Sequence, residues 1–165
     1  MYLEFLYVIL DYFSVLTKKE KRFEWGLPIL LGGISLYLYV GDSIQYDFIK
    51  NIIGFIGVLL GFTLTALTLI LSSGRIKSNT QKHPTDRKIR GKTISLYRLI
   101  VVSFTYLITM ESLLCLFFYI GSLYSSISLG MWAVIPNTFF IILFLNIILS
   151  TVRATTMLYF IIAVR

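Results

Sequence analysis

Residues 52–71 read IIGFIGVLLGFTLTALTLIL, a run of apolar and small residues without a charge. As an α-helix this stretch is long enough to cross a hydrocarbon core about 30 Å thick. The whole chain of 165 residues is 57% hydrophobic and 14% charged, with a mean hydropathy of +0.83. A soluble domain of this size leaves much of its surface in water and could not bury so many apolar side chains. The sequence therefore predicts an integral membrane protein with one domain.

Three further apolar stretches are candidates to cross the membrane, at residues 25–44, 99–123 and 132–152. With residues 52–71 they predict an all-α, polytopic fold, a transmembrane domain of four helices within residues 25–163. The second and third helices are connected by a basic loop, residues 72–98.

Residues 1–24 form a separate N-terminal segment. Its apolar part is too short to span comfortably and is interrupted by two acids, but apolar residues recur at helical spacing: Phe5, Val8, Ile9, Phe13 and Leu16. This pattern predicts a short amphipathic helix in the membrane interface. Whether it lies on the membrane, inserts, or packs against another subunit stays open at this stage.

The distribution of basic residues predicts the topology. Of the 15 Lys and Arg residues, all except Lys50 precede the first span, lie between the second and third, or follow the fourth. Short loops rich in Lys and Arg stay in the cytoplasm. We therefore expect a multi-pass protein of a bacterial inner (plasma) membrane with both termini cytoplasmic, and the net charge of +7 needs no nucleic acid to explain it.

Glu111 is the one acid inside the predicted third span. A carboxylate at that depth is unfavourable unless it is paired, protonated or reached by water. Two interpretations stay open: a proton- or ion-sensitive site facing a cavity or an oligomer axis, and a protonated carboxyl that fixes helix packing. The nearest polar partners in depth are Thr63 and Thr65, whereas an ion pair with Arg153 is disfavoured because Arg153 lies nearer the inner face.

Small residues predict a packing face on the second span, and polar residues share a face on the fourth. Gly57 and Gly61 have the G-x-x-x-G spacing that lets helix backbones approach closely, and the face extends through Gly54 and Thr65. On the fourth span the polar residues are Asn146, Ser150 and Arg153. They indicate either the inner mouth of a pore, or an interhelical hydrogen bond from Asn146 with Arg153 extended to lipid phosphates.

The basic loop is a candidate surface for binding a cytosolic protein or anionic lipid head groups. Direct nucleic-acid binding is disfavoured because few aromatic residues are available to stack on bases. The candidate residues are Arg75, Lys77, Lys82, Arg87, Lys88, Arg90 and Lys92.

The sequence does not predict an enzyme. No phosphate-binding glycine loop, zinc-ligand spacing or nucleophile elbow is present. One histidine, His83, and one cysteine, Cys115, are too few for most catalytic or metal sites. We therefore expect no catalytic residues, no metal and no cofactor.

The order of features resembles small four-helix membrane proteins of bacterial antiphage systems, over roughly residues 50–160. The residues that carry the resemblance are Ala66-Leu67-Thr68 before the basic loop, Tyr106 and Glu111, Ser125-Ser126-Ile127-Ser128, and Pro136. The similar families are the Kiwa membrane subunit KwaA and the phage lambda exclusion protein RexB. The first implies a homo-oligomer, a tetramer by preference, that senses phage and recruits a cytosolic DNA-binding effector similar to KwaB. The second implies an oligomeric ion channel that depolarises the membrane.

Overall fold

The computed structural model describes residues 4–40, 48–123 and 134–163. These residues are mostly helical, as predicted. The elements follow one another as α1 (Glu4–Val15), α2 (Lys18–Lys21), the π-helix η1 (Arg22–Gly26), α3 (Leu27–Val40), α4 (Phe48–Ser72), α5 (Gly74–Gln81), β1 (Pro84–Ile89), β2 (Lys92–Ser95), α6 (Leu96–Leu123) and α7 (Val134–Ala163).

Three helices are long and apolar enough to cross a membrane. These stretches are Ile52–Ser72 in α4, Leu96–Ile120 in α6 and Ile135–Ile161 in α7. They correspond to three of the four predicted spans and support the assignment as a membrane protein. The fourth prediction, residues 25–44, corresponds to α3, which has 14 residues and a length of about 21 Å. The end of that predicted span lies outside the described residues, so the fourth crossing and the orientation of the termini stay predictions.

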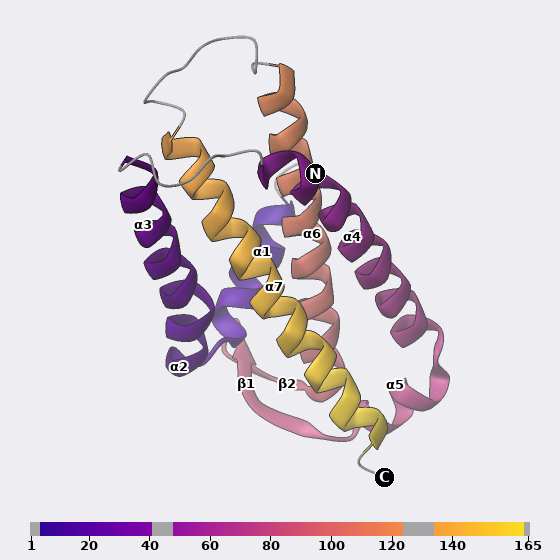
Figure 1. Cartoon of the computed structure of the whole chain (residues 1–165). Coiled ribbons are helices and arrows are strands. Elements are labelled where there is room, and N and C mark those ends of the chain that lie inside the picture. The colour runs from indigo at the N-terminus through magenta and orange to yellow at the C-terminus, as the bar shows by residue number, and fades with distance from the viewer. Residues whose placement is uncertain (1–3, 41–47, 124–133, 164–165) are drawn as a thin grey trace.

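The four long helices form a row in the order α3, α7, α6 and α4 (Figure 1). Helix α6 is the central element, because it packs against α4, α7 and α1. Half of its apolar span is buried, compared with 22% for the spans of α4 and α7. Its buried side chains form a core with Ile56 and Ile70 of α4 and with Ile147 of α7; those on α6 include Ile100, Phe104, Leu107 and Leu114.

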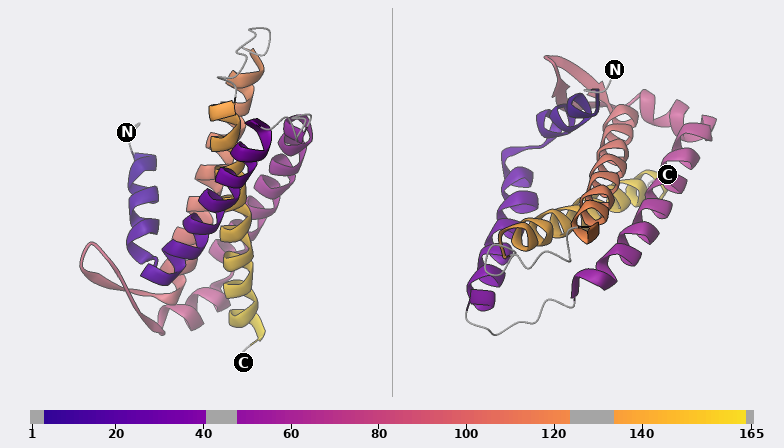
Figure 2. Two further views of the ribbon diagram at one scale, coloured as in Figure 1. Left: turned by 60° about the vertical axis from the view of Figure 1, so that its left-hand side comes forward. Right: turned by 90° about the horizontal axis from the view of Figure 1, so that it is seen from above.

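Helix α1 packs against α6 of its own chain (Figure 2). The contact centres on Tyr12, whose ring stacks on Tyr106 with the ring centres 3.7 Å apart and the planes 4° from parallel. Tyr12 is 1% exposed, whereas Leu10 on the opposite face of α1 is 62% exposed. The amphipathic pattern of residues 1–16 is therefore partly explained by packing within the chain, an arrangement that none of the three sequence-based alternatives included.

The basic loop is folded, and the prediction of an all-α chain is wrong here. Strands β1 and β2 pair as an antiparallel hairpin. Arg90 and Gly91 form its two-residue turn with φ angles of 50° and 80°, as in the type I′ turns of short hairpins. Ile89 and Ile94 bury their side chains against Val15 and Leu99. The sequence does not predict this hairpin because its turn is Arg-Gly, whereas the usual sequence of such a turn is Asn-Gly or Asp-Gly.

Candidate functional site

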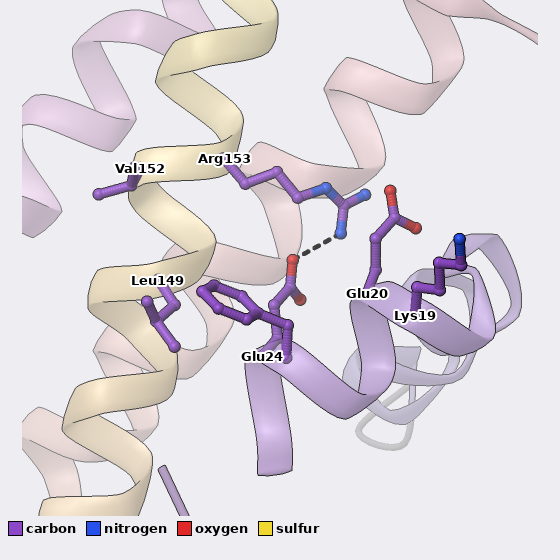
Figure 3. A pocket seen from close by; sticks show the side chains of 7 residues that line it. Lys19, Glu20, Glu24, Leu149, Val152 and Arg153 are labelled. Atoms are coloured by element: carbon purple, nitrogen blue, oxygen red, sulfur yellow. Dashed lines mark hydrogen bonds and ion pairs between the residues drawn. The ribbon is translucent and has the colours of Figure 1, made fainter. Parts of the chain in front are cut away.

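Six polar side chains from four elements meet where the N-terminal segment packs against α6 and α7. We call them the polar cluster: Tyr12 of α1, Glu24 of η1, Tyr106 of α6, and Asn146, Ser150 and Arg153 of α7. Figure 3 shows Arg153 extending from α7 toward Glu24. The cluster joins residues more than 100 positions apart in the chain, so only the tertiary fold creates it.

An ion pair between Glu24 and Arg153 lies at the centre of the polar cluster. Arg153 Nη1 donates to Glu24 Oε1 at 2.8 Å, and the side chains of Arg153 and Glu24 are 15% and 3% exposed, respectively. The Tyr12 hydroxyl donates to the second carboxylate oxygen of Glu24 at 2.7 Å. Asn146 Nδ2 donates to the Glu24 backbone carbonyl at 2.9 Å. A buried ion pair is tolerated best when its remaining polar atoms are hydrogen-bonded. Here both carboxylate oxygens have donors, whereas Nε and Nη2 of Arg153 have no partner among the described residues.

The two tyrosines of the polar cluster act as neutral hydrogen-bond donors. Burial raises the pKa of Tyr12 well above its ordinary value, and the nearby negative charge of Glu24 raises it further. The Tyr12 hydroxyl therefore keeps its proton and can donate to Glu24. Tyr106 donates to Asn146 Oδ1 at 2.9 Å, which orients the amide so that its Nδ2 group points to the carbonyl of Glu24.

The structure brings together Asn146, Ser150 and Arg153, the three residues that the sequence placed on one face of the fourth span. The interhelical hydrogen bonds of Asn146 are confirmed. The expectation that Arg153 extends to lipid phosphates did not include Glu24, which is paired with the Nη1 group of Arg153 inside the protein. Sequence reasoning missed Glu24 and Tyr12. The available signal for Glu24 was an acid shortly after the basic run 18–22 and before the first apolar stretch, where its charge needs a partner.

Glu111 lies apart from the polar cluster, in a contact between α6 and α4. It is 0% exposed, and its Oε2 atom lies 2.6 Å from Thr63 Oγ1, one of the two expected partners. Thr65 instead donates to the carbonyl of Gly61 on its own helix. Glu111 Oε1 has no hydrogen-bond partner among the described residues. Arg153 pairs with Glu24 rather than with Glu111.

The surroundings of Thr63 favour a neutral Glu111. Thr63 Oγ1 lies 3.1 Å from the carbonyl oxygens of both Leu59 and Leu60, and a hydroxyl has only one proton to donate. When Glu111 is protonated it donates to Thr63, and Thr63 then donates to a carbonyl of its own helix. In this arrangement each of the two hydroxyl protons has an acceptor, while Glu111 Oε1 stays without a partner among the described residues. The contact between Thr63 and Glu111 therefore supports a packing role for Glu111.

The predicted packing face of α4 is open in the single chain. Gly54, Gly57 and Gly61 have no neighbouring atom within 4 Å of the place where a Cβ atom would stand, and Thr65 is exposed. Within the described parts of the chain, the face does not serve packing between helices. It is available to a lipid or to another subunit.

The basic residues between α4 and α6 divide into two groups. Arg87 forms a bidentate ion pair with Glu20, at 2.9 Å for both bonds, and also donates to the carbonyl of Val15. Arg90 pairs with Asp11 at 3.2 Å and lies over the ring of Tyr7. These two arginines attach the hairpin to the N-terminal segment. The other basic side chains described here are exposed: Lys77, Lys82, Lys88 and Lys92. The side chain of Arg75 is outside the described part.

Glu20 is the acid that links α2 to the hairpin. It completes a capping box with Thr17 at the start of α2 and accepts both bonds from Arg87. Burial alone would raise the pKa of Glu20, but the hydrogen bonds from Arg87 and Thr17 outweigh this effect and lower its pKa from 4.5 to about 2. Glu20 therefore stays ionised at neutral pH and holds Arg87 in place.

Within the described ranges, no group of three or more His, Cys, Asp or Glu side chains is placed to hold a metal ion. No protein-family model matches the chain, and comparisons with curated proteins and with solved structures gave no match. The resemblance to the Kiwa and RexB proteins therefore rests on the sequence layout alone, and the functions that it implies are proposals.

Proposed function

We propose that this protein is the membrane subunit of a bacterial antiphage defence system. In this proposal it is a homo-oligomeric sensor and scaffold of the inner membrane, and it docks a cytosolic DNA-binding effector through the basic residues between α4 and α6. The docking of an effector is supported by one observation, the attachment of the β1–β2 hairpin to the N-terminal segment. Arg87 and Arg90 fix its position, while Lys77, Lys82, Lys88 and Lys92 stay exposed for an acidic partner surface.

The proposed topology has four crossings, with α3 as the fourth and the hairpin and both termini in the cytoplasm. The one-sided distribution of Lys and Arg supports it. Helix α3 also exposes a series of apolar side chains, among them Ile29, Leu30, Ile34 and Leu38. Such a surface is unfavourable in water and suits contact with lipid.

The proposed homo-oligomer, for which the resemblance favours a tetramer, uses the open small-residue face of α4. Small residues let helix backbones of neighbouring subunits approach closely in a membrane. We expect Gly57→Ile with Gly61→Ile to reduce the oligomer, as measured by light scattering in mild detergent. Gly33→Ile is the matched control, because a Cβ atom at Gly33 also meets nothing within 4 Å. A monomeric parent protein would contradict the proposal.

Docking is tested by pull-down of the effector from detergent extracts. Replacing Lys77, Lys82, Lys88 and Lys92 by Ala should abolish capture, because these side chains are exposed and the anchoring arginines are spared. The control replaces Lys18, Lys19, Lys21 and Arg22 by Ala, which removes the same charge from the N-terminal segment. Equal loss in both variants would indicate a general charge effect and contradict docking through this surface.

The alternative is an oligomeric ion channel similar to RexB, with Glu111 as the residue that supports it. Glu111 is fully covered within one chain, so a pore between subunits would not have its carboxyl at the wall. Asn146 and Ser150 are likewise 0% and 2% exposed. These positions favour the scaffold over the channel. Conductance of reconstituted protein that changes with Glu111→Gln would reverse this preference.

A further inference from the structure

A groove borders the polar cluster between the N-terminal segment and α7. Its volume is about 380 Å³, and its lining residues are Lys19, Glu20, Phe23, Glu24, Leu149, Val152 and Arg153. In Figure 3 the residues of α2 and η1 form one side of this groove, and those of α7 form the other. We infer that this groove binds the head group of one anionic phospholipid. This inference does not rest on the proposed antiphage function.

Arg153 offers an unused anion-binding edge in the groove. Its Nη1 group is taken by Glu24 Oε1, but Nε and Nη2 are buried and have no hydrogen-bond partner among the described residues. These two N–H groups lie on one side of the planar guanidinium, with the spacing that two oxygens of a phosphate accept. Buried donors without acceptors are unfavourable, so a phosphate that displaces the side chains covering these two groups satisfies both.

The charge of the groove favours an anion. Its two acids are already paired, Glu24 with Arg153 and Glu20 with Arg87. Lys19 is the lining cation that forms no ion pair within the described ranges. The same short stretch of chain exposes further basic side chains: Lys18, Lys21 and Arg22. The unneutralised charge is therefore positive.

The apolar wall of the groove identifies the anion as a lipid. Phe23 is 60% exposed and Val152 is 58% exposed, and Val152 lies within the apolar span of α7. Helix α3 begins directly after η1 and exposes Leu27 and Leu30, which extends the apolar surface away from Lys19. A free phosphate would gain nothing from this surface, whereas the acyl chains of a phospholipid would cover it.

Native mass spectrometry of the detergent-solubilised full chain tests the inference. After incubation with phosphatidylglycerol or phosphatidylcholine, we expect one bound phosphatidylglycerol and about tenfold weaker retention of phosphatidylcholine, because the net-neutral choline head group brings its own cation to the basic groove. Inorganic phosphate should not displace the lipid. Equal retention of the two lipids, or displacement by phosphate, would overturn the proposal.

Two variants locate the site. Lys19→Glu should reduce retention of phosphatidylglycerol about tenfold. Lys18→Glu makes the same charge change outside the groove lining and should reduce retention much less. Arg153→Lys retains the charge beside Glu24 but lacks the Nε and Nη2 edge, so it should also lose the lipid. Because Arg153 also supports the fold, Lys19→Glu decides the outcome if Arg153→Lys does not fold. Equal loss in the Lys18 and Lys19 variants would refute a site in this groove.

Discussion

Glu24 and Glu111 are both buried acids in contact with the long helices, but their surroundings differ. Glu24 is 3% exposed and receives hydrogen bonds from Arg153 and Tyr12 on its two carboxylate oxygens. Glu111 is 0% exposed and contacts Thr63 through one oxygen, while its Oε1 atom has no partner in the described part of the chain. Equal burial therefore accompanies two kinds of surroundings, an ion pair with a second donor at Glu24 and a single neutral hydroxyl partner at Glu111.

A position inside an apolar stretch of the sequence is therefore a weak guide to which buried acid joins distant segments of the fold. Glu111 drew attention because it interrupts an apolar span, and Glu24 did not because it follows a basic run. In the fold, Glu24 joins the N-terminal segment to α7, whereas Glu111 joins α6 to α4 with a single hydrogen bond. We expect the two positions to respond very differently to substitution.

The largest effect should come from Arg153→Ala. It leaves the Glu24 carboxylate buried without its counter-charge, which typically costs about 3–5 kcal/mol. Unfolding in detergent, followed by circular dichroism against denaturant, measures this loss. Arg98→Ala, at an exposed basic position, should have almost no effect. In the double variant Glu24→Gln with Arg153→Ala, part of the stability should return; no recovery would show that Glu24 is not charged in the fold.

Tyr12→Phe should have the next largest effect. The ring stays stacked on Tyr106, but the hydrogen bond from the hydroxyl to a charged carboxylate is lost, a change of about 1.5–3 kcal/mol. The same unfolding measurement applies. Tyr7→Phe is the control, since Tyr7 is 55% exposed on the same helix. Equal stability of the Tyr12 and Tyr7 variants would mean that the hydroxyl does not support Glu24.

Thr63→Val should cost only about 1 kcal/mol, because it removes one hydrogen bond between neutral groups. Thr65→Val is the matched control two positions further along α4, and it should change stability less because Thr65 is exposed and bonds within its own helix. A loss for Thr63→Val as large as that for Arg153→Ala would show that Glu111 is ionised, and the contrast between the two acids would fail.

The smallest effect should be the pH dependence of Glu20, a third acid that is 27% exposed and therefore screened by water. Its pKa is about 2 in the fold and 4.5 ordinarily, so its stabilising contribution is complete above about pH 4.5 and is lost as the pH falls toward 2. Thermal unfolding at a series of pH values measures this. Glu20→Gln should remove this part of the acid dependence, and Glu4→Gln, at an exposed site, should not.

Much of the fold was predictable from local patterns. The long apolar runs predict α4, α6 and α7 because a helix that crosses lipid must be predominantly apolar. Each of these predicted spans overlaps an apolar helix of the structure, although that of α7 continues to Ile161, past the predicted end at residue 152. The hairpin was not predictable, because its Arg-Gly turn is uncommon for this geometry. Thr63 was found as a partner of Glu111 because depth along two helices can be counted from the sequence.

The sequence by itself determined where the three long apolar helices lie, and these helices indicate a membrane protein; the placement of the basic residues on one side of the membrane stays a prediction. These properties depend on the composition of each stretch of the chain, because the apolar content of a stretch decides whether it can lie in a bilayer. Only the tertiary structure decided that Tyr12 and Glu24 meet Arg153, that Arg87 and Arg90 anchor the hairpin, and that the glycines of α4 face outward. Those contacts join distant segments, and the pairing of buried charges depends on which helix faces which.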